Sequence, residues 1–597
     1  MLKLIYGFYK EITRNIFRYL GLFIVSEIII VGICIPIFTF LGSIALRIAN
    51  VPYLSNANLI SVITTKPFLD IVFLIILIAI LLAIYWQVTF LVLGIFQINS
   101  GNTLTIRPLL KLSISRVHHT FVQSIWFLLI YTILILPFGG MGFSTPLLNK
   151  VKIPGFIMDY VFHDNPLLLT TLIAIYVVTF YLGIRFILVL PLMIGSHISI
   201  RKAIAESWNK TGKRFVKIAA NFFALVVSSV LVSAIALFAM VIFQSLWDSI
   251  APTGVAYFAA TFNLLIIEAG LLFLNIGLGV ASIMVMLNEL SDDTNFNRTM
   301  AANLMSLRKG ENPVQHKVLT RVGLVLVIAG ALGFNVLYLN GFFNSDPITI
   351  SHRGVNAGNG VQNTIPSLKN TSRLHPNFVE MDIHETKDHK FVVMHDENLK
   401  ALTGVNKAPY QLTLKQLTDL TASENGSKAH VASFDDYFNT AHKLKQRLII
   451  EIKTTPHDDP KMVERFNKEY SKRILAYHDE IHTLDYNVVQ TLKKINPKLT
   501  VGYILPFNFI GVPQSRADFY TMEYSTLNTS FLINAQVSGK QVYAWTVNDD
   551  SDMSKMNFMG VDGIITDNLS TLQQNERDIN NKPSFTQRLL NFVTENN

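Results

Sequence analysis

The sequence predicts an α-helical membrane domain with several spans, followed by an α/β domain of the (β/α)8-barrel type. Three observations lead to this prediction. Half of the 597 residues are hydrophobic and the mean hydropathy is +0.38, which is typical of a chain with a membrane portion. Apolar runs of spanning length fill the chain up to about residue 340. From residue 346 the composition becomes mixed and polar, and short β-rich runs alternate with helical stretches.

Seven apolar runs are long enough to cross a bilayer as helices, since about 20 residues suffice. They cover residues 17–46, 71–98, 119–140, 166–196, 215–246, 255–288 and 318–340. The first run is too long for the core of a signal peptide, so we interpret it as a retained span. Residues 1–345 are therefore expected to form a seven-helix transmembrane domain with interfacial helices.

Lysine and arginine gather in alternate loops of this domain. The loops 99–118, 197–214 and 289–317 are basic, and the loops between them are much poorer in both residues. The positive-inside rule places the N-terminus in the cytoplasm, and an odd number of spans then puts the C-terminal domain outside the cell. The expected location is the cell membrane, as a multi-pass protein. Because this distribution accounts for the net charge of +9, nucleic acid is not an expected partner.

Three ionisable residues, Glu27, Arg185 and Glu268, lie inside expected spans. A charge at that depth is costly unless it is paired or faces the bundle interior, so we expect Arg185 to pair with Glu27 or Glu268. A polar cavity that admits a lipid headgroup is the alternative interpretation. The single cysteine, Cys34, excludes an intramolecular disulfide and a zinc site built on thiolates.

Residues 346–570 are expected to form the barrel, because their β-rich runs recur at intervals that suit a parallel sheet. The expected strands lie in ITISH, FVEMDIH, RLIIEIK, NVVQTL, LTVGYIL, QVYAWTV and VDGIITD. Residues 571–597 read as a polar, peripheral tail with one short amphipathic stretch. In barrels of this kind, functional side chains stand where strands end on the C-terminal face.

Acidic residues mark two of these strands. Glu380 and Asp382 are two apart in FVEMDIH, and the period of two in a strand points both carboxylates the same way. Glu451 and Lys453 have the same spacing in LIIEIK. Carboxylates held together outside water repel one another unless they share a proton or a cation, so a hard metal bound by oxygen is the simplest interpretation. Lys453 then offers a cation to an anionic substrate.

Other polar residues also follow expected strands. They are His352, Arg353, His395, Asp396, Trp545, Asn548 and Asp567. Each alone has a structural explanation, since a histidine can be merely solvated and a charged pair can be a local salt bridge. Their joint occurrence at successive strand ends favours a catalytic site.

The motifs SHRG, NT, E-x-D, HD, E-x-K, W-T-V-N and G-I-I-T-D occur in this order, and they resemble the glycerophosphodiester phosphodiesterase family over about residues 348–570. The N-terminal half resembles the membrane domain that precedes this catalytic domain in some Gram-positive bacterial proteins. The resemblance implies a TIM barrel that hydrolyses glycerophosphodiester bonds with a divalent metal, Ca or Mg.

The resemblance also implies roles for individual residues. The metal ligands would be Glu380, Asp382 and Glu451, and the acid/base pair would be His352 and His395. The substrate-binding residues would be Arg353, Lys453, Asn363 and Trp545, of which Arg353 and Lys453 would contact the phosphate. Histidine suits both proton-transfer tasks because it titrates near neutral pH. Which histidine is the acid stays open, and so does the choice between attack by a neighbouring hydroxyl and attack by water.

One position departs from the family pattern, which usually reads Glu-Asn-Thr after the histidine-arginine-glycine loop. Here the sequence is Gln362-Asn363-Thr364. If this position helps to bind the metal, the affinity should be lower or the ligand set different. If it only forms hydrogen bonds, little changes. His384, two residues beyond Asp382, is expected at the rim of the site.

Tethering to a membrane favours substrates within reach of the bilayer. The expected partners are glycerophosphodiesters, lysophospholipids, membrane lipid and the glycerol-phosphate chains of lipoteichoic acid. Two alternatives remain. The first is a transporter or lipid-handling module with an accessory barrel, which Arg185 and the two glutamates would favour. The second is a barrel that binds glycerol-phosphate polymer without cleaving it, for which Gln362 is the only hint.

Overall fold

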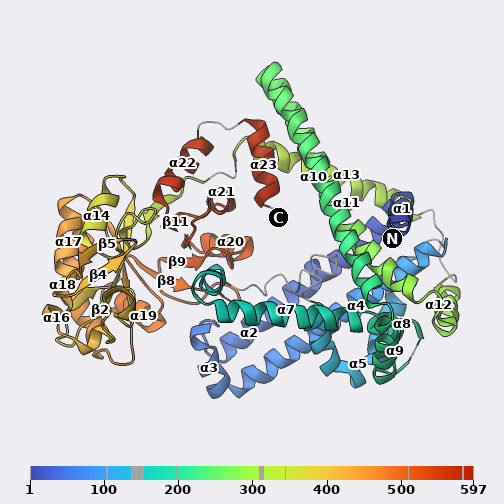
Figure 1. Cartoon of the computed structure of the whole chain (residues 1–597), viewed down its shortest axis with the longest axis horizontal. Helices are drawn as coiled ribbons and strands as arrows, with labels where there is room; N and C mark the ends of the chain where they lie inside the picture. The colour runs from blue at the N-terminus through green and yellow to red at the C-terminus, as the bar shows by residue number, and fades with distance from the viewer. Residues whose placement is uncertain are drawn as a thin grey trace. The chain divides into compact units, whose positions relative to one another are not determined.

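The computed structural model describes residues 2–54, 56–102, 105–135, 147, 154–196, 198–307, 315–342, 345–508, 510–580 and 584–595. Its internal contacts divide the chain into two compact units (Figure 1). The first consists of Met1–Ala49, Ile63–Val151 and Asp159–Val336. The second consists of Leu337–Asn597 together with two short segments, Asn50–Val62 and Lys152–Met158.

The first unit is helical. Its elements, with the helix that leaves it, are α1 (Leu2–Ile29), a π-helical turn (Ile30–Cys34), α2 (Ile35–Ile48), α4 (Pro67–Asn99), α5 (Ile106–Ile135), α7 (Pro166–Phe186), α8 (Val189–Ser196), α9 (Ile200–Gly212), α10 (Phe215–Ile250), α11 (Thr253–Glu289), α12 (Thr294–Leu307) and α13 (Gln315–Leu339). The long helices α10 and α11 run side by side (Figure 1). Phe223, Ile235 and Phe238 on α10 are exposed, and an exposed apolar surface of this extent requires lipid.

Six helical stretches in the described residues are long and apolar enough to cross a membrane. They are Ile5–Ile48, Pro67–Asn99, Pro166–Ser196, Phe215–Ile250, Thr253–Glu289 and Val322–Leu339. They coincide with six of the seven expected spans. Helix α5 covers the first part of the remaining expected span, 119–140, and residues 136–140 lie outside the described residues.

The ion pair expected for Arg185 is wrong. Its guanidinium donates to the backbone oxygen of Trp208 at 2.7 Å and to the hydroxyl of Tyr181 at 3.0 Å, and it lies 3.8 Å from the centroid of the Trp208 ring. Glu27 and Glu268 each accept a hydrogen bond from a side-chain amide instead. Arg185 therefore links α7 to α9 through the backbone oxygen and the aromatic ring of Trp208.

The second unit contains a closed barrel of eight parallel strands (Figure 1). The strands are β1 (Ile348–Ser351), β2 (Phe378–Glu385), β6 (Leu448–Ile452), β7 (Glu480–Thr483), β8 (Val501–Leu505), β9 (Phe519–Glu523), β10 (Gln541–Trp545) and β11 (Gly563–Thr566). Each pairs with its neighbour in chain order, and β11 pairs with β1 to close the barrel. Three short strands are added to this framework: β3 (Phe391–Val393), β4 (Thr421–Glu424) and β5 (Ser427–His430).

Helices follow most strands and cover the outside of the barrel. They are α14 (Ile365–Ser372), α17 (Phe434–Lys443), α18 (Met462–Tyr477), α19 (Tyr486–Ile495), α20 (Thr529–Val537), α21 (Asp550–Met559) and α22 (Leu569–Asn580). In α18 the buried residues Met462, Phe466, Tyr470 and Ile474 recur every four positions, so one face of the helix packs on the sheet. The connection 506–518, between β8 and β9, contains no helix at the positions described there, which are all but 509.

One expected strand is wrong, and two strands of the eight-stranded barrel were not expected. The run NVVQTL belongs to helix α19, which Asp485 caps by accepting hydrogen bonds from the backbone N–H groups of Asn487 and Val488. The apolar residues of this run therefore bury a helical face rather than a strand. The strand that precedes it, β7, has the sequence EIHT, and β9 has the sequence FYTME.

The helical layer extends past residue 570, where the expected tail begins. Leu572 on α22 is completely buried. A further helix, α23 (Phe585–Glu595), ends the described chain. On α23 the guanidinium of Arg588 donates to the backbone oxygen of Leu339 at 2.8 Å, and the hydroxyl of Tyr338 donates to the backbone oxygen of Arg588 at 2.7 Å. The amphipathic stretch of the tail is therefore tied to the rest of the unit.

Two segments from between the expected spans also belong to this unit. Tyr53 packs against two tyrosine rings of the barrel, with centroids 4.9 and 5.4 Å away. In the other segment, the backbone N–H of Gly155 donates to the Glu523 carboxylate at 3.1 Å, and the ring of Phe156 stacks on Trp545 with centroids 5.9 Å apart. They include parts of α3 (Asn56–Thr65) and α6 (Gly155–Asp159). The compact unit therefore does not begin at residue 346.

Candidate active site

Three adjacent strands bring the acidic residues together. In the register of the sheet, Asp382 on β2 lies beside Glu451 on β6, and Glu451 lies beside His482 on β7. Glu380 is two residues before Asp382 on the same strand. All four side chains are buried, so their charges must be balanced by one another, by neighbouring cations or by a bound ion.

Glu380, Glu451 and His482 form the tightest cluster, which we call the acid–histidine cluster. One ligand atom from each lies within 4.8 Å of the others. The Nε2 atom of His482 has no hydrogen-bond partner among the described residues, and its distance of 3.6 Å from Glu380 Oε1 is too long for a hydrogen bond. Two carboxylate oxygens and a free imidazole nitrogen fit a divalent metal.

A second group in the described residues, Glu385, His389 and Asp459, has similar spacing. There the guanidinium of Arg465 already contacts both carboxylates. Since the arginine neutralises this group, it is a salt-bridge network rather than a candidate metal site.

Asp382 does not belong to the acid–histidine cluster, because its carboxylate has other partners. Its carboxylate is 3.1 Å from Lys453 Nζ and accepts a hydrogen bond from the Asn363 amide at 2.8 Å. Burial opposes ionisation of Asp382, but Lys453, His395 and Arg353 together hold its pKa well below the usual value. The structure thus places the three metal ligands expected from the sequence on the adjacent strands β2 and β6, and Lys453 contacts two of them, Asp382 and Glu451.

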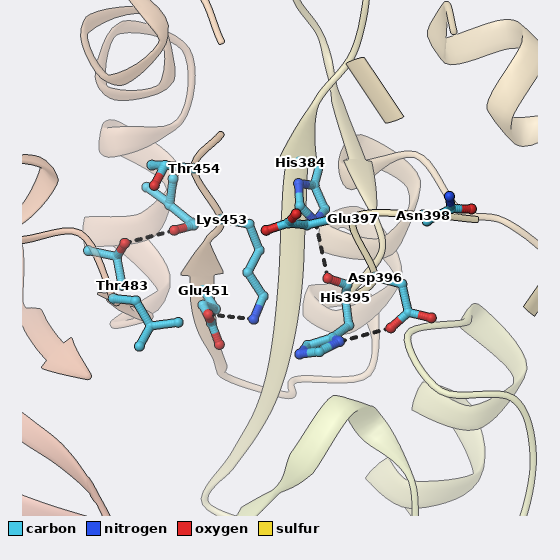
Figure 2. A pocket seen from close by; sticks show the side chains of 11 residues that line it. His384, His395, Asp396, Glu397, Asn398, Glu451, Lys453, Thr454 and Thr483 are labelled. Atoms are coloured by element: carbon cyan, nitrogen blue, oxygen red, sulfur yellow. Dashed lines mark hydrogen bonds and ion pairs between the residues drawn. The ribbon is translucent and has the colours of Figure 1, made fainter. Parts of the chain in front are cut away.

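Lys453 bridges the two acidic strands. Its Nζ atom lies 2.6 Å from Glu451 Oε1, the contact drawn in Figure 2. It also lies 3.1 Å from Asp382 Oδ1. Burial disfavours the ammonium ion, but Glu451 and Asp382 more than offset it and raise the pKa of Lys453. Lys453 is therefore a permanent positive charge at the floor of the site, which suits a phosphate group.

His352 is held by a carboxylate and an amide. Its Nδ1 atom lies 2.8 Å from Asp567 Oδ1, and the amide of Asn548 donates to the other oxygen of Asp567 at 2.9 Å. Burial disfavours the imidazolium ion, but Asp567 outweighs it and raises the pKa of His352. For Asp567, burial is likewise outweighed, and His352 lowers its pKa to about 2. The pair fixes the orientation of the ring and leaves Nε2 available.

His395 follows strand β3 and lines the same cavity as His352. Its Nδ1 atom is 3.0 Å from the Asp396 carboxylate, and this hydrogen bond lowers the pKa of Asp396. The ring of His384 is 3.1 Å from the backbone oxygen of His395. His384 borders the same cavity as His395, although only 2% of it is exposed.

Arg353 and Gly354 form the turn after β1. Both have positive φ, 50° and 67°. A Cβ atom on Gly354 would lie 2.7 Å from the hydroxyl of Tyr437, so glycine is required for the close packing as well as for the conformation. The turn points the backbone N–H of Arg353 at Glu380 Oε2, 2.9 Å away.

Gln362 lies in a chain of hydrogen bonds rather than in the acid–histidine cluster. Its side-chain oxygen accepts from Arg353 Nη1 at 2.5 Å, and its side-chain nitrogen donates to Glu424 at 2.6 Å. Glu424, on the β4–β5 hairpin, also accepts from the backbone N–H of Gln362 at 2.8 Å. The family usually has a carboxylate at position 362. Here the nearest equivalent is Glu424, which is hydrogen-bonded to Gln362.

We expect Gln362→Glu to lower the melting temperature of the barrel. The change replaces the hydrogen bond to Glu424 with two carboxylates in contact, and losing such a bond costs about 1–3 kcal/mol. A loss of 1 kcal/mol lowers the melting temperature by about 2–4 °C in a domain of this size. Glu424→Gln in the same chain should restore the bond and the stability. Equal melting temperatures for the single variant and the parent protein would contradict this assignment.

Two adjoining cavities open onto these residues. The larger, about 510 Å³, is lined by residues that Figure 2 labels, including His384, His395 and Lys453. The smaller is lined by His352, Arg353, Glu380 and Trp545 among others, and it shares His395, Glu451, Lys453 and Leu484 with the larger. A volume of this size is typical of a small-molecule site.

Two residues predicted to bind substrate differ in their placement. Trp545 lines the smaller cavity, with its ring N–H donating to the backbone oxygen of Thr521 at 3.2 Å. Asn363 is only 2% exposed, and its amide is bound to Asp382. This placement favours a role for Asn363 in positioning Asp382 over the direct substrate contact expected from the sequence.

His482 is the residue that sequence reasoning missed. Its strand, EIHT, has four residues and only one large apolar side chain, so no β-like run drew attention to it. The signal that could have identified it is its position on β7, the strand next to β6, directly beside Glu451.

Two family models match this chain. Residues 7–332 match the model of the membrane domain of glycerophosphoryl diester phosphodiesterase, and residues 352–571 match the glycerophosphoryl diester phosphodiesterase family. A glycerophosphodiester phosphodiesterase of Caldanaerobacter subterraneus is 26% identical over 239 residues, which are 38% of this chain and 96% of that protein. Human lysophospholipase D GDPD1 is 25% identical over 262 residues, which are 36% of this chain and 82% of that protein.

Among solved structures, a glycerophosphodiester phosphodiesterase from Parabacteroides distasonis is 25% identical, with a TM-score of 0.35, and the match covers 40% of this chain and 99% of that one. An Oleispira antarctica phosphodiesterase, solved with the product sn-glycerol-3-phosphate, is 20% identical, with a TM-score of 0.33, and covers 38% and 96%. The first of the two family models alone spans more than half of the sequence. The chain therefore belongs to the glycerophosphoryl diester phosphodiesterase family, as an enzyme whose catalytic barrel follows the membrane domain of that family.

Proposed function

We propose that this enzyme is a metal-dependent hydrolase that acts at the outer face of the membrane on glycerophosphodiesters, lysophospholipids or a glycerol-phosphate polymer such as lipoteichoic acid. The observation that carries the proposal is the convergence of two cationic and two histidine side chains around the acid–histidine cluster. Arg353 and Lys453 border the same cavity as His352 and His395. Cations of fixed charge bind the phosphodiester, and titratable groups beside them move protons.

In this site the anionic phosphodiester lies against Lys453 and Arg353. Lys453 contributes a point charge, and Arg353 contributes a planar group that matches phosphate oxygens. Gln362 holds the Arg353 guanidinium, as the 2.5 Å contact indicates, so less conformational entropy is lost on binding. Trp545 offers an apolar wall to the alcohol portion of the substrate.

The two histidines divide the proton transfers. One accepts the proton of the attacking hydroxyl as its oxygen bonds to phosphorus, and the other donates a proton to the alcohol oxygen as its bond to phosphorus breaks. If the attacker is the neighbouring hydroxyl of the glycerol, the alcohol leaves and a cyclic phosphate forms, which water then opens to glycerol phosphate. If the attacker is water, the alcohol and glycerol phosphate form directly. Both histidines carry a carboxylate on Nδ1, which leaves Nε2 of each for the substrate.

Glu380, Asp382 and Glu451 would hold the divalent metal that the family implies, and a ring nitrogen of His482 lies within 4.8 Å of carboxylate oxygens of Glu380 and Glu451. When bound, such an ion supplies positive charge that stabilises the negative charge developing on phosphate oxygens.

The substrates can be compared directly with purified full-length protein. Lysophosphatidylglycerol, glycerophosphoglycerol and lipoteichoic acid are each given to the enzyme, with and without EDTA. We expect release of glycerol phosphate or its lipid counterpart, loss of turnover with EDTA and recovery on addition of a divalent metal. Turnover that is unaffected by EDTA after prolonged dialysis would overturn metal dependence. The substrate with the highest kcat/KM identifies the class that the site prefers.

The same assay tests the orientation in the membrane. Glycerophosphoglycerol is charged and does not cross a bilayer unaided, so intact cells that express the enzyme should cleave it in the medium. The distribution of Lys and Arg among the loops supports this arrangement. Cleavage by inverted vesicles but not by intact cells would place the barrel in the cytoplasm instead.

A further inference from the structure

The smaller cavity has a charged side and an apolar side. Its two cations, Arg353 and Lys453, follow β1 and β6. Three of its apolar residues come from the strands on the other side of β6: Leu484 follows β7, Ile504 lies on β8 and Trp545 ends β10. Strands β7 to β10 are successive neighbours in the barrel. A phosphodiester held by the cations therefore directs one of its alcohol portions towards an apolar wall.

The apolar wall continues beyond the strands of the barrel, through residues 152–158 of the same compact unit. The ring of Phe156 stacks on Trp545, with the centroids 5.9 Å apart and 23° between the ring planes. Phe156 is 44% exposed and its neighbour Ile157 is 40% exposed. Trp545 thus joins the cavity to an aromatic ring that water still reaches. Apolar surface that continues from a cavity in this way is available to a ligand.

The position of Phe156 is fixed by the residue before it. The backbone N–H of Gly155 donates to Glu523 Oε1 at 3.1 Å and to Ser525 Oγ at 3.0 Å. Glu523 is 1% exposed and lies beside Trp545 in the register of the sheet. A Cβ atom at position 155 would lie only 3.2 Å from Glu523 Oε1, so glycine permits the close approach. Phe156 is therefore held next to Trp545 before a ligand binds, which lowers the entropy cost of binding.

We propose that Phe156 is a specificity-determining residue that contacts a hydrocarbon chain of the substrate, an inference that rests on the proposed function. The substrate class that the site prefers is then a phosphodiester with a single acyl chain, a lysophospholipid. Such a chain leaves water when it lies on the apolar wall and on the Phe156 ring. A glycerol-phosphate polymer presents hydroxyl groups to the same ring and gains less from it.

The test compares two substrates that differ only in the chain, with purified full-length protein and added divalent metal. They are glycerophosphoglycerol and hexanoyl-lysophosphatidylglycerol, the latter used below its micelle concentration so that both are monomeric. The parent protein should have the higher kcat/KM for the acylated substrate. In Phe156→Ala the ratio of the two kcat/KM values should fall about tenfold, as expected for the loss of an apolar contact. The change should lie in KM, because the chain is bound equally in the ground state and the transition state.

Matched variants separate this role from a structural one. Phe156→Leu keeps an apolar side chain and should retain most of the preference, whereas Phe156→Ser should lose it; this pair gives the same comparison if Phe156→Ala does not fold. Val537→Ala removes a side chain that is 83% exposed on α20 and lines neither cavity, and it should leave the ratio unchanged.

The outcomes distinguish this inference from the proposed function. A parent protein that does not prefer the acylated substrate, or an equal fall for both substrates in Phe156→Ala, overturns the role of Phe156 and leaves the hydrolysis intact. A parent protein that hydrolyses neither substrate overturns both.

Discussion

Replacement of Glu380 by alanine is expected to abolish turnover of every substrate. Glu380 belongs to the acid–histidine cluster, and it also accepts the backbone N–H of Arg353 at 2.9 Å. The variant therefore loses a proposed metal ligand and the carboxylate that holds the turn of Arg353. A bound metal contributes several kcal/mol of charge stabilisation, so kcat should fall by at least about 10³-fold. The measurement is kcat with glycerophosphoglycerol at saturating metal.

Glu397→Ala is the matched control for this variant. Glu397 lines the larger cavity but is exposed and lies outside the acid–histidine cluster. Its activity should stay close to that of the parent protein. Thermal melting of both variants separates loss of catalysis from loss of fold. A folded Glu380→Ala enzyme with a tenth or more of the parent kcat would show that Glu380 is dispensable.

The second large effect is expected from Asp567→Asn. Asp567 raises the pKa of His352 against the opposing effect of burial. Without the carboxylate, burial prevails and the pKa of His352 falls, so the limb of the pH–rate profile that His352 controls moves to lower pH. At pH 7 kcat should fall by at least about tenfold, since acid–base catalysis as a whole contributes about 10²–10⁴-fold. The measurement is kcat/KM from pH 4.5 to 9.

The stability of the same variant has a definite pH dependence. The raised pKa of His352 stabilises the fold below its unfolded value of about 6.5, and this is lost as the pH rises through the folded value. The lowered pKa of Asp567 stabilises the fold above its unfolded value of about 3.9, and this is lost on acidification. The parent and Asp567→Asn should therefore differ most in melting temperature between about pH 4 and 6.5. Asp578→Asn, on an exposed position of α22, should show no such window.

The parts of the fold that could be predicted are those with a strong local signal. The six spans in the described residues are long and apolar, and strands β6 and β8 are buried and mostly apolar. The run NVVQTL predicts a strand, although it belongs to helix α19. Its apolar residues Val488, Val489 and Leu492 fit one side of a strand as well as one face of a helix. The N-terminal cap by Asp485 favours the helix, and this cap is recognised only from the hydrogen bonds in the structure.

The candidate site was predictable where a motif lies within one strand. Glu451 and Lys453 stand at the end of β6 as expected, whereas Glu380 is the third residue of β2, and the period of two points it the same way as Asp382. Contacts between strands were not predictable, because they depend on register. That register brings His482 beside Glu451 and lets Lys453 pair with Asp382.

The two segments that precede the barrel in sequence have a consequence for how this enzyme can be divided. Phe156 covers one side of Trp545, a residue of the cavity wall, and Tyr53 covers part of the barrel exterior. A truncated protein that starts at residue 346 would expose both surfaces to water and lose an aromatic ring next to the entrance for the alcohol group. Soluble catalytic fragments of this chain should therefore discriminate less well among alcohols than the intact enzyme, however well they fold.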